Sequence, residues 1–548
     1  MIETCVSARR QTGPRYIGII ILLAIVVLAG SQADAAFVRS TGSTPASETA
    51  ACSALGNRDF SQTQDAPVQI TSAKMVEASG TAASFCKVEG YVYPQVGIEI
   101  HLPLAKDWNG NLITTGNGGW AGSIDSAACD SHLKRGYACV TTDTGHRGSD
   151  GMWALNNLPL QIDFGYRAIH VSTLTAKAVV NRYYSKAAQR AYFMGCSTGG
   201  YQGLVAAQRF PWDFDGIIAG APDMDEADLT MREIWAQRAN LDAAGKPILD
   251  STARELLHRA ALEKCDMDDG VKDGIVGNPV GCFLDPAKLL CDAGQTQQCL
   301  TAVQVDAAKR IYAGPPHTGE KAVRGALAGS ELTWDFGTDT AYSDSLFKEM
   351  IYGASPGWTT SSYDFDRDYK RLGLAALYTD TNPDLRHFKA AGGKLLVYQG
   401  GTDTVEMPTA IVDYYETVEK IFGGSKPTQE FFRLFVVPGM NHCGNGVGAY
   451  SIDYLTYLEN WVERDQAPDA MIGAHVSDSY LLSLPLPEGF PADASREARI
   501  AAAASKLQFP LDPKIPVSFT RPMYPYPKFA RYASGDPNRA ASFHPAQP

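Results

Sequence analysis

The chain has 548 residues, a formal net charge of −12 at pH 7 and 45% hydrophobic residues. This length exceeds that of one compact core of ordinary size, so we expect one large domain with an insertion, or two unequal domains. An acidic balance without a basic stripe argues against nucleic acid as a partner and against binding to anionic membranes.

Residues 1–35 predict a cleaved secretory signal peptide. Three arginines precede an apolar run from Tyr16 to Gly30, and Ala33-Asp34-Ala35 follows it. The run is shorter than the ~20 residues of a membrane-spanning helix, which favours a cleaved signal over an uncleaved anchor. No later segment is apolar for long enough to span a bilayer. We expect a bacterial protein that is secreted or periplasmic and has no stable membrane association after cleavage.

The cysteines predict a set of disulfides. Removal of residues 1–35 takes away Cys5 and leaves an even number, which is typical of a disulfide framework in an oxidising compartment. Local spacing suggests the pairs Cys52–Cys86, Cys129–Cys139, Cys265–Cys282 and Cys291–Cys299. Cys196, which precedes Ser197, and Cys443, which follows His442, are left over. A bridge between them would bring Ser197 and His442 together, because bridged Cα atoms lie about 5.5 Å apart.

Strand and helix patterns alternate in residues 36–221. Residues 88–104 alternate as a pair of strands around Pro94, and residues 108–122 form a short strand that enters a glycine-rich loop. Another strand is expected within residues 135–146, and residues 169–184 have helical periodicity. This part of the chain is expected to form the first half of an α/β core.

Residues 191–203, "AYFMGCSTGGYQG", contain a serine in G-x-S-x-G spacing. A short apolar run ends at Ser197, and a helix pattern follows it. Gly195 and Gly199 permit the tight turn that exposes the serine hydroxyl above the sheet. The spacing alone is common in loops, but a strand, a glycine turn and a helix in this order predict a nucleophile elbow.

The alternation stops between Pro222 and about Leu385, after a buried-type strand at residues 214–222. Helical stretches, four cysteines and many aromatic residues replace it: Trp334, Phe336, Tyr342, Phe347, Tyr352, Trp358, Tyr363 and Phe365. An insertion of this size between core strands predicts a lid domain, residues 222–385, above the strand ends. A self-contained aromatic core is the alternative, and both descriptions can hold because a lid also needs a core.

The insertion contains an acidic loop, "CDMDDGVKDGIVGNP". It crowds four carboxylates together, those of Asp266, Asp268, Asp269 and Asp273. A cation would relieve their repulsion, and hard oxygen ligands suit Ca²⁺. The loop is not an EF-hand, because Val271 stands at the sixth position from Asp266, where an EF-hand requires glycine. An exposed Asp-Gly turn without an ion is the alternative.

Residues 386–548 are expected to complete the core and to add a C-terminal extension. A strand within 392–408 breaks into a loop that carries Asp403, residues 409–424 predict a helix, and a strand within 431–444 leads to His442. Residues 452–464 predict a closing helix. The order Ser, Asp, His, each just past a strand, is that of the α/β-hydrolase fold, which has a mostly parallel sheet with helices on both faces.

The chemistry of these positions predicts a catalytic triad. Ser197 would attack an acyl carbon, His442 would take and pass on its proton, and Asp403 would orient the imidazole. An oxyanion hole would use backbone N–H groups from Thr198 and from one of two loop glycines, Gly118 or Gly119.

Other residues compete for two of these roles. Glu406 and Asp143 are alternatives for the acid, and Asp403 is favoured because it begins the loop directly after its strand. His101, His132 and His146 also lie near strands, and we expect them to be structural or exposed.

Three motifs together resemble the tannase and feruloyl esterase family, which also includes mono(2-hydroxyethyl) terephthalate hydrolase. They are the C-S pair at the elbow, the H-C pair at the histidine and the "CDxxDGxxDGI" loop, and the resemblance covers nearly the whole mature chain. It implies the Cys196–Cys443 bridge and the same triad. It also implies a structural calcium site formed by the side chains of Asp266, Asp269 and Asp273 and the backbone carbonyls of Val271 and Ile275. Many family members carry a further C-terminal cysteine pair; Tyr524 and His544 stand in those places here, so that bridge should be absent.

The sequence therefore predicts an exported serine carboxylesterase that forms an acyl-enzyme. Its expected substrate is a small ester of an aromatic carboxylic acid, of feruloyl, galloyl or terephthaloyl type. A non-catalytic binding protein on the same fold is one alternative, which the loss of Ser197 or His442 would have favoured. A lipase or a peptidase is another, and neither explains the paired C-S and H-C motifs.

Overall fold

The computed structural model describes residues 45–548 apart from residues 79–82, 317–323, 335, 337–339, 354–356, 366, 369–372, 487–489, 492 and 508. The predicted signal peptide, residues 1–35, lies outside the described residues. None of the helices described is long and apolar enough to cross a membrane.

A nine-stranded sheet forms the centre of the described chain, in the order β1-β2-β3-β5-β4-β6-β7-β8-β9. The pairs from β1 to β5 are antiparallel, and the pairs from β5 through β4 to β9 are parallel. The predicted pair of strands around Pro94 is β2 and β3. The strands are β1 Val68–Val76, β2 Phe85–Val92, β3 Val96–Pro103, β4 Leu112–Thr115, β5 Ala138–Thr142, β6 Ala191–Cys196, β7 Gly216–Gly220, β8 Lys394–Gly400 and β9 Phe432–Val437.

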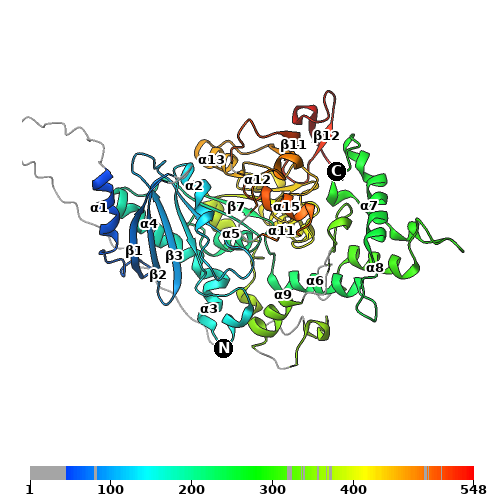
Figure 1. The fold of residues 1–548 in the computed structure, drawn as a ribbon, viewed down its shortest axis with the longest axis horizontal. Coiled ribbons are helices and arrows are strands. Elements are labelled where there is room, and N and C mark those ends of the chain that lie inside the picture. The colour runs from blue at the N-terminus through cyan, green and yellow to red at the C-terminus, as the bar shows by residue number, and fades with distance from the viewer. Residues whose placement is uncertain are drawn as a thin grey trace, which may run out of the picture. The chain divides into compact units, whose positions relative to one another are not determined.

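Helices cover both faces of the parallel part of the sheet (Figure 1). Successive strand residues point to opposite faces, so Leu396 on β8 joins the cluster beneath α13, while Leu395 joins the cluster beneath α5 and α11. Burial on both faces explains why the parallel strands are rich in apolar residues. The core helices are α1 Pro45–Leu55, α2 Asp130–Lys134, α3 Leu158–Ile162, α4 Ala168–Tyr184, α5 Thr198–Arg209, α11 Pro408–Phe422, α12 Ser425–Gln429 and α13 Tyr454–Arg464.

The segment between β7 and β8 adds no strand to the sheet in its described residues. It contains α6 Glu226–Asn240, α7 Ser251–Cys265, α8 Ala302–Ala313, α9 Ala341–Ser343 and α10 Arg386–Ala390. Trp334 is buried in a cluster within the insertion, whereas Phe347 and Trp358 share a cluster with Trp120 of the glycine-rich loop. The insertion therefore has a core of its own and also packs against the core loop that precedes the elbow.

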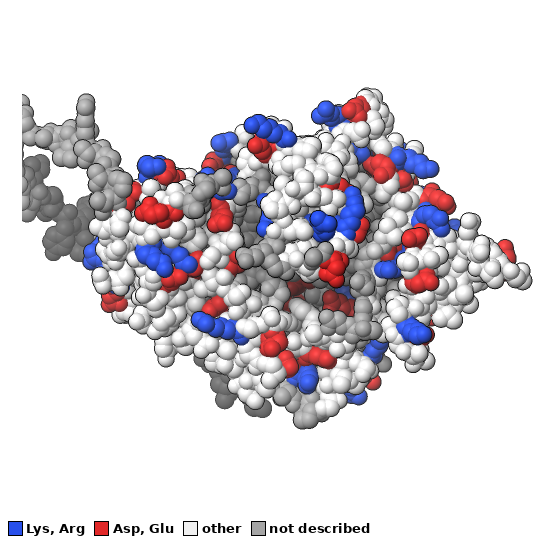
Figure 2. All heavy atoms as spheres, viewed as in Figure 1, with Lys and Arg blue, Asp and Glu red and all other residues white. Residues whose placement is uncertain are grey.

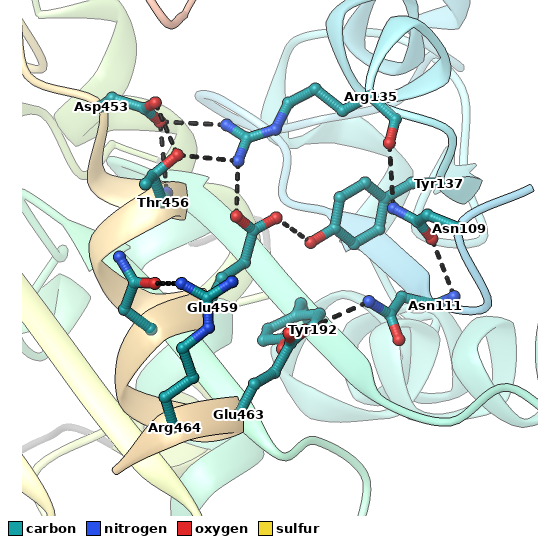
Figure 3. A network of polar contacts seen from close by, with 11 residues as sticks. Asn109, Asn111, Arg135, Tyr137, Tyr192, Asp453, Thr456, Glu459, Glu463 and Arg464 are labelled. Atoms are coloured by element: carbon teal, nitrogen blue, oxygen red, sulfur yellow. Dashed lines mark hydrogen bonds and ion pairs between the residues drawn. The ribbon is translucent and has the colours of Figure 1, made fainter. Parts of the chain in front are cut away.

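The helix that follows the His442 loop is fixed to the sheet by a polar network (Figure 3). Arg135 donates to Asp453 over 3.0 Å and to Glu459 over 2.7 Å, and the hydroxyl of Tyr192 donates to Glu463 over 2.9 Å. Asp453 also caps α13, because its carboxylate accepts from the N–H of Thr456. The network ties α13 and its capping residue to β6 and to the turn that leads into β5.

The described part of the C-terminal extension contains two small antiparallel strand pairs and two helices. The elements are β10 Met471–Val476, α14 Asp478–Leu481, α15 Arg496–Ala504, β11 Val517–Met523, β12 Phe529–Tyr532 and β13 Phe543–Ala546. β10 pairs with β11, and β12 pairs with β13, both antiparallel.

The structure forms all five disulfides that the sequence suggests. Four of them join cysteines 8 to 34 residues apart. The fifth joins Cys196 to Cys443 across 247 residues, with 5.9 Å between the Cα atoms.

Candidate active site

Ser197 stands at the turn between β6 and α5 with φ 64° and ψ −128°. This positive φ is rare for a residue with a Cβ, and such backbone strain is typical of functional sites. The glycines around it are required because the turn has no room for a side chain. A Cβ on Gly195 would lie 2.7 Å from Gly199, and one on Gly200 would lie 2.2 Å from the carbonyl oxygen of Gly220. The structure thus places Ser197 on the predicted elbow.

His442 and Asp403 form a direct pair. Nδ1 of His442 lies 3.0 Å from Oδ2 of Asp403, whose side chain is buried. The other oxygen of Asp403 accepts from the backbone N–H groups of Val405 and Glu406, at 2.9 and 3.0 Å, and Gln399 donates to Oδ2. With its carboxylate fixed in this way, Asp403 holds the Nδ1–H tautomer and leaves Nε2 of His442 as the basic nitrogen.

The pKa of His442 reflects this pairing. Burial alone would lower it, but the hydrogen bond and the charge of Asp403, with further negative charge on Asp223 and Glu233, raise the pKa above the ordinary value for histidine. The site therefore stabilises the imidazolium form that a general base passes through.

The Cys196–Cys443 bridge joins the elbow to the histidine loop, but the hydroxyl of Ser197 does not reach His442. Oγ of Ser197 donates instead to Oδ1 of Asp223 over 3.4 Å, and the described residues show no hydrogen bond between Ser197 and His442. Two of the three predicted triad members are thus in contact. The third, Ser197, is turned toward Asp223 instead.

A buried acidic cluster beside Ser197 was not predicted. It consists of Asp223, Glu226 and Glu406, which are at most 4% exposed, and of Glu233, which is partly exposed. Burial, and next the charge of Asp223, raise the pKa values of Glu226 and Glu406 well above the ordinary range, and raise the pKa of Glu233 to about 8. Figure 2 shows Asp and Glu atoms at the floor of the central hollow, where Figure 1 has α6.

A sequence signal for Asp223 existed. It follows β7 in "GAPD", just past the end of a parallel strand, which is where the other candidate residues of the site also stand. The predicted boundary of the insertion, at residue 222, assigns Asp223 to the lid rather than to the site.

The competing residues have structural roles. Asp143 accepts from the backbone N–H groups of Gly97 and Gly145, both at 2.8 Å. His101 is paired with Glu99, and the ring of His146 stacks on Trp153. Glu406 lies next to the triad, but it is Asp403 that contacts the histidine.

The predicted oxyanion donors lie on adjoining segments. The hydroxyl of Thr198 donates to the carbonyl oxygen of Gly119 over 2.7 Å, so the glycine loop rests on the elbow. A Cβ on Gly118 or Gly119 would meet no atom within 4 Å, so both glycines border open space. Thr198 is the first residue of α5, and its N–H therefore has no partner within the helix.

The acidic loop follows α7 in the chain and lies against β11 and β12 of the C-terminal extension. Asp266 accepts from the N–H groups of Asp273 and Gly274, and Asp273 forms an ion pair with Arg521 at 2.5 Å. Asp269 is buried, and this burial, together with the charges of Asp273 and Asp266, raises its pKa to about 7.

The donors of this loop fit calcium in kind, since they are carboxylate oxygens crowded at a buried position. Within the described chain, however, no three His, Cys, Asp or Glu side chains converge as a metal site requires. Arg521 supplies part of the counter-charge. Calcium at this loop thus remains a proposal that rests on donor chemistry.

The sequence of this chain is similar to those of known esterases. A family model described as "Tannase and feruloyl esterase" matches residues 78–546. A probable feruloyl esterase of Arthroderma benhamiae is 32% identical, covering 83% of each chain. The mono(2-hydroxyethyl) terephthalate hydrolase of Piscinibacter sakaiensis is 30% identical, covering 92% of this chain and 93% of that protein.

The fold is also similar to that of a solved feruloyl esterase structure. The crystal structure of feruloyl esterase B from Aspergillus oryzae superposes with a TM-score of 0.76 at 25% identity, over 91% of this chain and all of that one. This likeness, with the parallel sheet and its two helical layers, confirms the predicted α/β-hydrolase fold.

Proposed function

This chain belongs to the tannase and feruloyl esterase family and is an esterase, and from that membership we propose that it is an exported serine carboxylesterase acting on esters of aromatic carboxylic acids. The acyl groups in question are of feruloyl, galloyl or terephthaloyl type. One observation supports the catalytic assignment most: the His442–Asp403 pair is joined to the strained serine of the elbow by the Cys196–Cys443 bridge.

In the proposed mechanism, Ser197 first turns from Asp223 toward His442. Its Oγ then bonds to the ester carbonyl carbon while its proton passes to Nε2 of His442. The carbonyl oxygen becomes an oxyanion, which the N–H groups of Thr198 and of Gly118 or Gly119 stabilise. The bond to the alcohol breaks, and the alcohol leaves with the proton from His442.

The acyl-enzyme is hydrolysed by the same groups. Water gives a proton to His442 and bonds to the acyl carbon; the second oxyanion then collapses, the bond from the acyl carbon to Ser197 Oγ breaks, and His442 returns the proton to Oγ as the acid is released. Asp403 keeps its negative charge throughout and stabilises the imidazolium in both halves.

We also propose that Asp266, Asp269, Asp273 and the carbonyls of Val271 and Ile275 hold a structural calcium ion, and that residues 222–385 act as a lid. The ion takes no part in the mechanism above. The decisive experiment for the function is hydrolysis of a panel of aromatic esters by the purified protein. Hydrolysis of none of them would contradict the proposal.

A further inference from the structure

Asp223 lies against the atom that would carry the acyl group. One of its oxygens accepts from Ser197 Oγ over 3.4 Å, and the other lies 3.1 Å from Thr198 Oγ1, whose single proton Gly119 accepts over the shorter distance of 2.7 Å. An acyl group bonded to Ser197, with its oxyanion at Thr198, would therefore lie beside the carboxylate of Asp223.

The negative charge near Ser197 has little compensation. Among the described residues, no lysine or arginine forms an ion pair with Asp223, Glu226, Glu233 or Glu406. His442 is a cationic group that acts on the cluster, since its positive charge opposes the rise in the pKa of Glu233. Asp403 already holds that histidine through a hydrogen bond.

The cluster also resists further negative charge. Burial, and next the charge of Asp223, raise the pKa values of Glu226 and Glu406 well above their ordinary range. A carboxylate brought in by a substrate would lose its hydration and meet the same repulsion, which is strong where water is excluded.

We propose that Asp223 is a specificity-determining residue that excludes acyl groups bearing a carboxylate and admits uncharged aromatic acyl groups. This inference rests on the proposed function, and it narrows the substrate class. Feruloyl and galloyl esters are uncharged at neutral pH, whereas a monoester of terephthalic acid carries a carboxylate on its ring. The chain is therefore an esterase for neutral aromatic esters.

Two substrates of matched shape test this. Methyl 4-carbamoylbenzoate and monomethyl terephthalate have the same ring and the same ester, and differ in carrying an amide or a carboxylate at the far end. We expect the wild-type protein to hydrolyse the neutral ester with a kcat/KM at least about tenfold higher. The ratio of the two values does not depend on the fraction of active protein, so it can be compared between variants.

Asp223→Asn keeps the shape of the side chain and removes its charge. We expect this variant to lower the preference for the neutral ester to about threefold or less. Asp143→Asn is the matched control, because Asp143 is also a buried carboxylate after a strand but contacts backbone N–H groups rather than Ser197. It should keep the wild-type ratio.

The outcomes separate this inference from the proposed function. Equal rates on the two esters with wild-type protein, or an unchanged ratio in Asp223→Asn, would overturn the role of Asp223 alone. If the Asp223→Asn variant is inactive, the ratio of kcat/KM for the neutral and the anionic ester in the wild-type protein still tests whether the site excludes anionic acyl groups. Wild-type protein that hydrolyses neither of these esters nor any other ester of the aromatic panel would overturn both the proposed function and this inference.

Discussion

Nδ1 of His442 lies 3.0 Å from Oδ2 of Asp403, and every oxygen of that buried carboxylate accepts at least one hydrogen bond. The acid therefore has one orientation, and so does the imidazole that it holds. The nucleophile is the member of the site that must still move, since Ser197 is turned toward Asp223.

Ser197→Ala should give a folded protein whose ester hydrolysis falls by several orders of magnitude, which is the scale seen when triad members are lost. The hydroxyl is partly exposed and makes only a long contact to Asp223, so its removal should leave the melting temperature nearly unchanged. Turnover and melting of the purified variant check both statements. Retention of most of the activity would place the nucleophile elsewhere.

The pH dependence of kcat/KM should follow His442. The base must be neutral to accept a proton, and its pKa is raised, so activity should be lost as the pH falls through a value above the ordinary histidine pKa of about 6.5. Asp403→Asn removes the main group that raises this pKa. We expect its acidic limb to move to lower pH while the rate falls by about 10⁴-fold.

A profile of kcat/KM from about pH 5 to 9 measures this limb, with Asp143→Asn as a control that should keep the wild-type midpoint. A wild-type midpoint below that of free histidine would contradict the assignment of His442.

Local patterns were sufficient to predict the elbow, because the apolar run of β6, the glycines and the periodicity of α5 lie in adjacent residues. Asp403 and His442 could be located for the same reason, each directly after a strand. The acidic cluster could not be predicted in this way. Glu226 and Glu233 belong to α6, where charged residues ordinarily face solvent, and Glu226 is buried where its carboxylate accepts from Tyr342, 116 residues further along the chain.

The acidic loop gives a prediction about stability. If calcium binds only the folded protein, a chelator should lower the melting temperature by a few degrees and added calcium should restore it. Asp269→Asn should abolish this response, because Asp269 is a buried proposed ligand. Asp268→Asn should keep it, since Asp268 is exposed and lies outside the proposed ligand set.

Metal analysis of the purified protein accompanies these melting curves. Protein that contains no calcium and whose melting temperature ignores both chelator and added calcium would remove the site. The Arg521–Asp273 ion pair would then be the interaction that neutralises the loop.

The Cys196–Cys443 bridge should matter more for turnover than for stability. Closing a loop of 247 residues should stabilise the fold by roughly 5 kcal/mol in the chain-entropy model. The bridge also fixes the neighbours of both cysteines, Ser197 and His442, which must approach within about 3 Å for proton transfer. An error of about 1 Å in such a contact can lower the rate about a hundredfold. We therefore expect the double variant Cys196→Ala, Cys443→Ala to melt at a lower temperature than the wild-type protein. At assay temperatures below that melting point it should be folded, and its kcat should be lower by at least about a hundredfold.

Removal of the Cys291–Cys299 pair is the matched comparison. This bridge closes a loop of 8 residues within the insertion and touches no candidate catalytic residue. Its loss should lower the melting temperature and leave kcat within about twofold, because the elbow and the His442 loop keep their own bridge. Peptide mapping of the non-reduced protein must first establish both pairs. A variant without the Cys196–Cys443 bridge that is folded and keeps nearly full turnover would show that the thiol before Ser197 does not position the serine against its histidine.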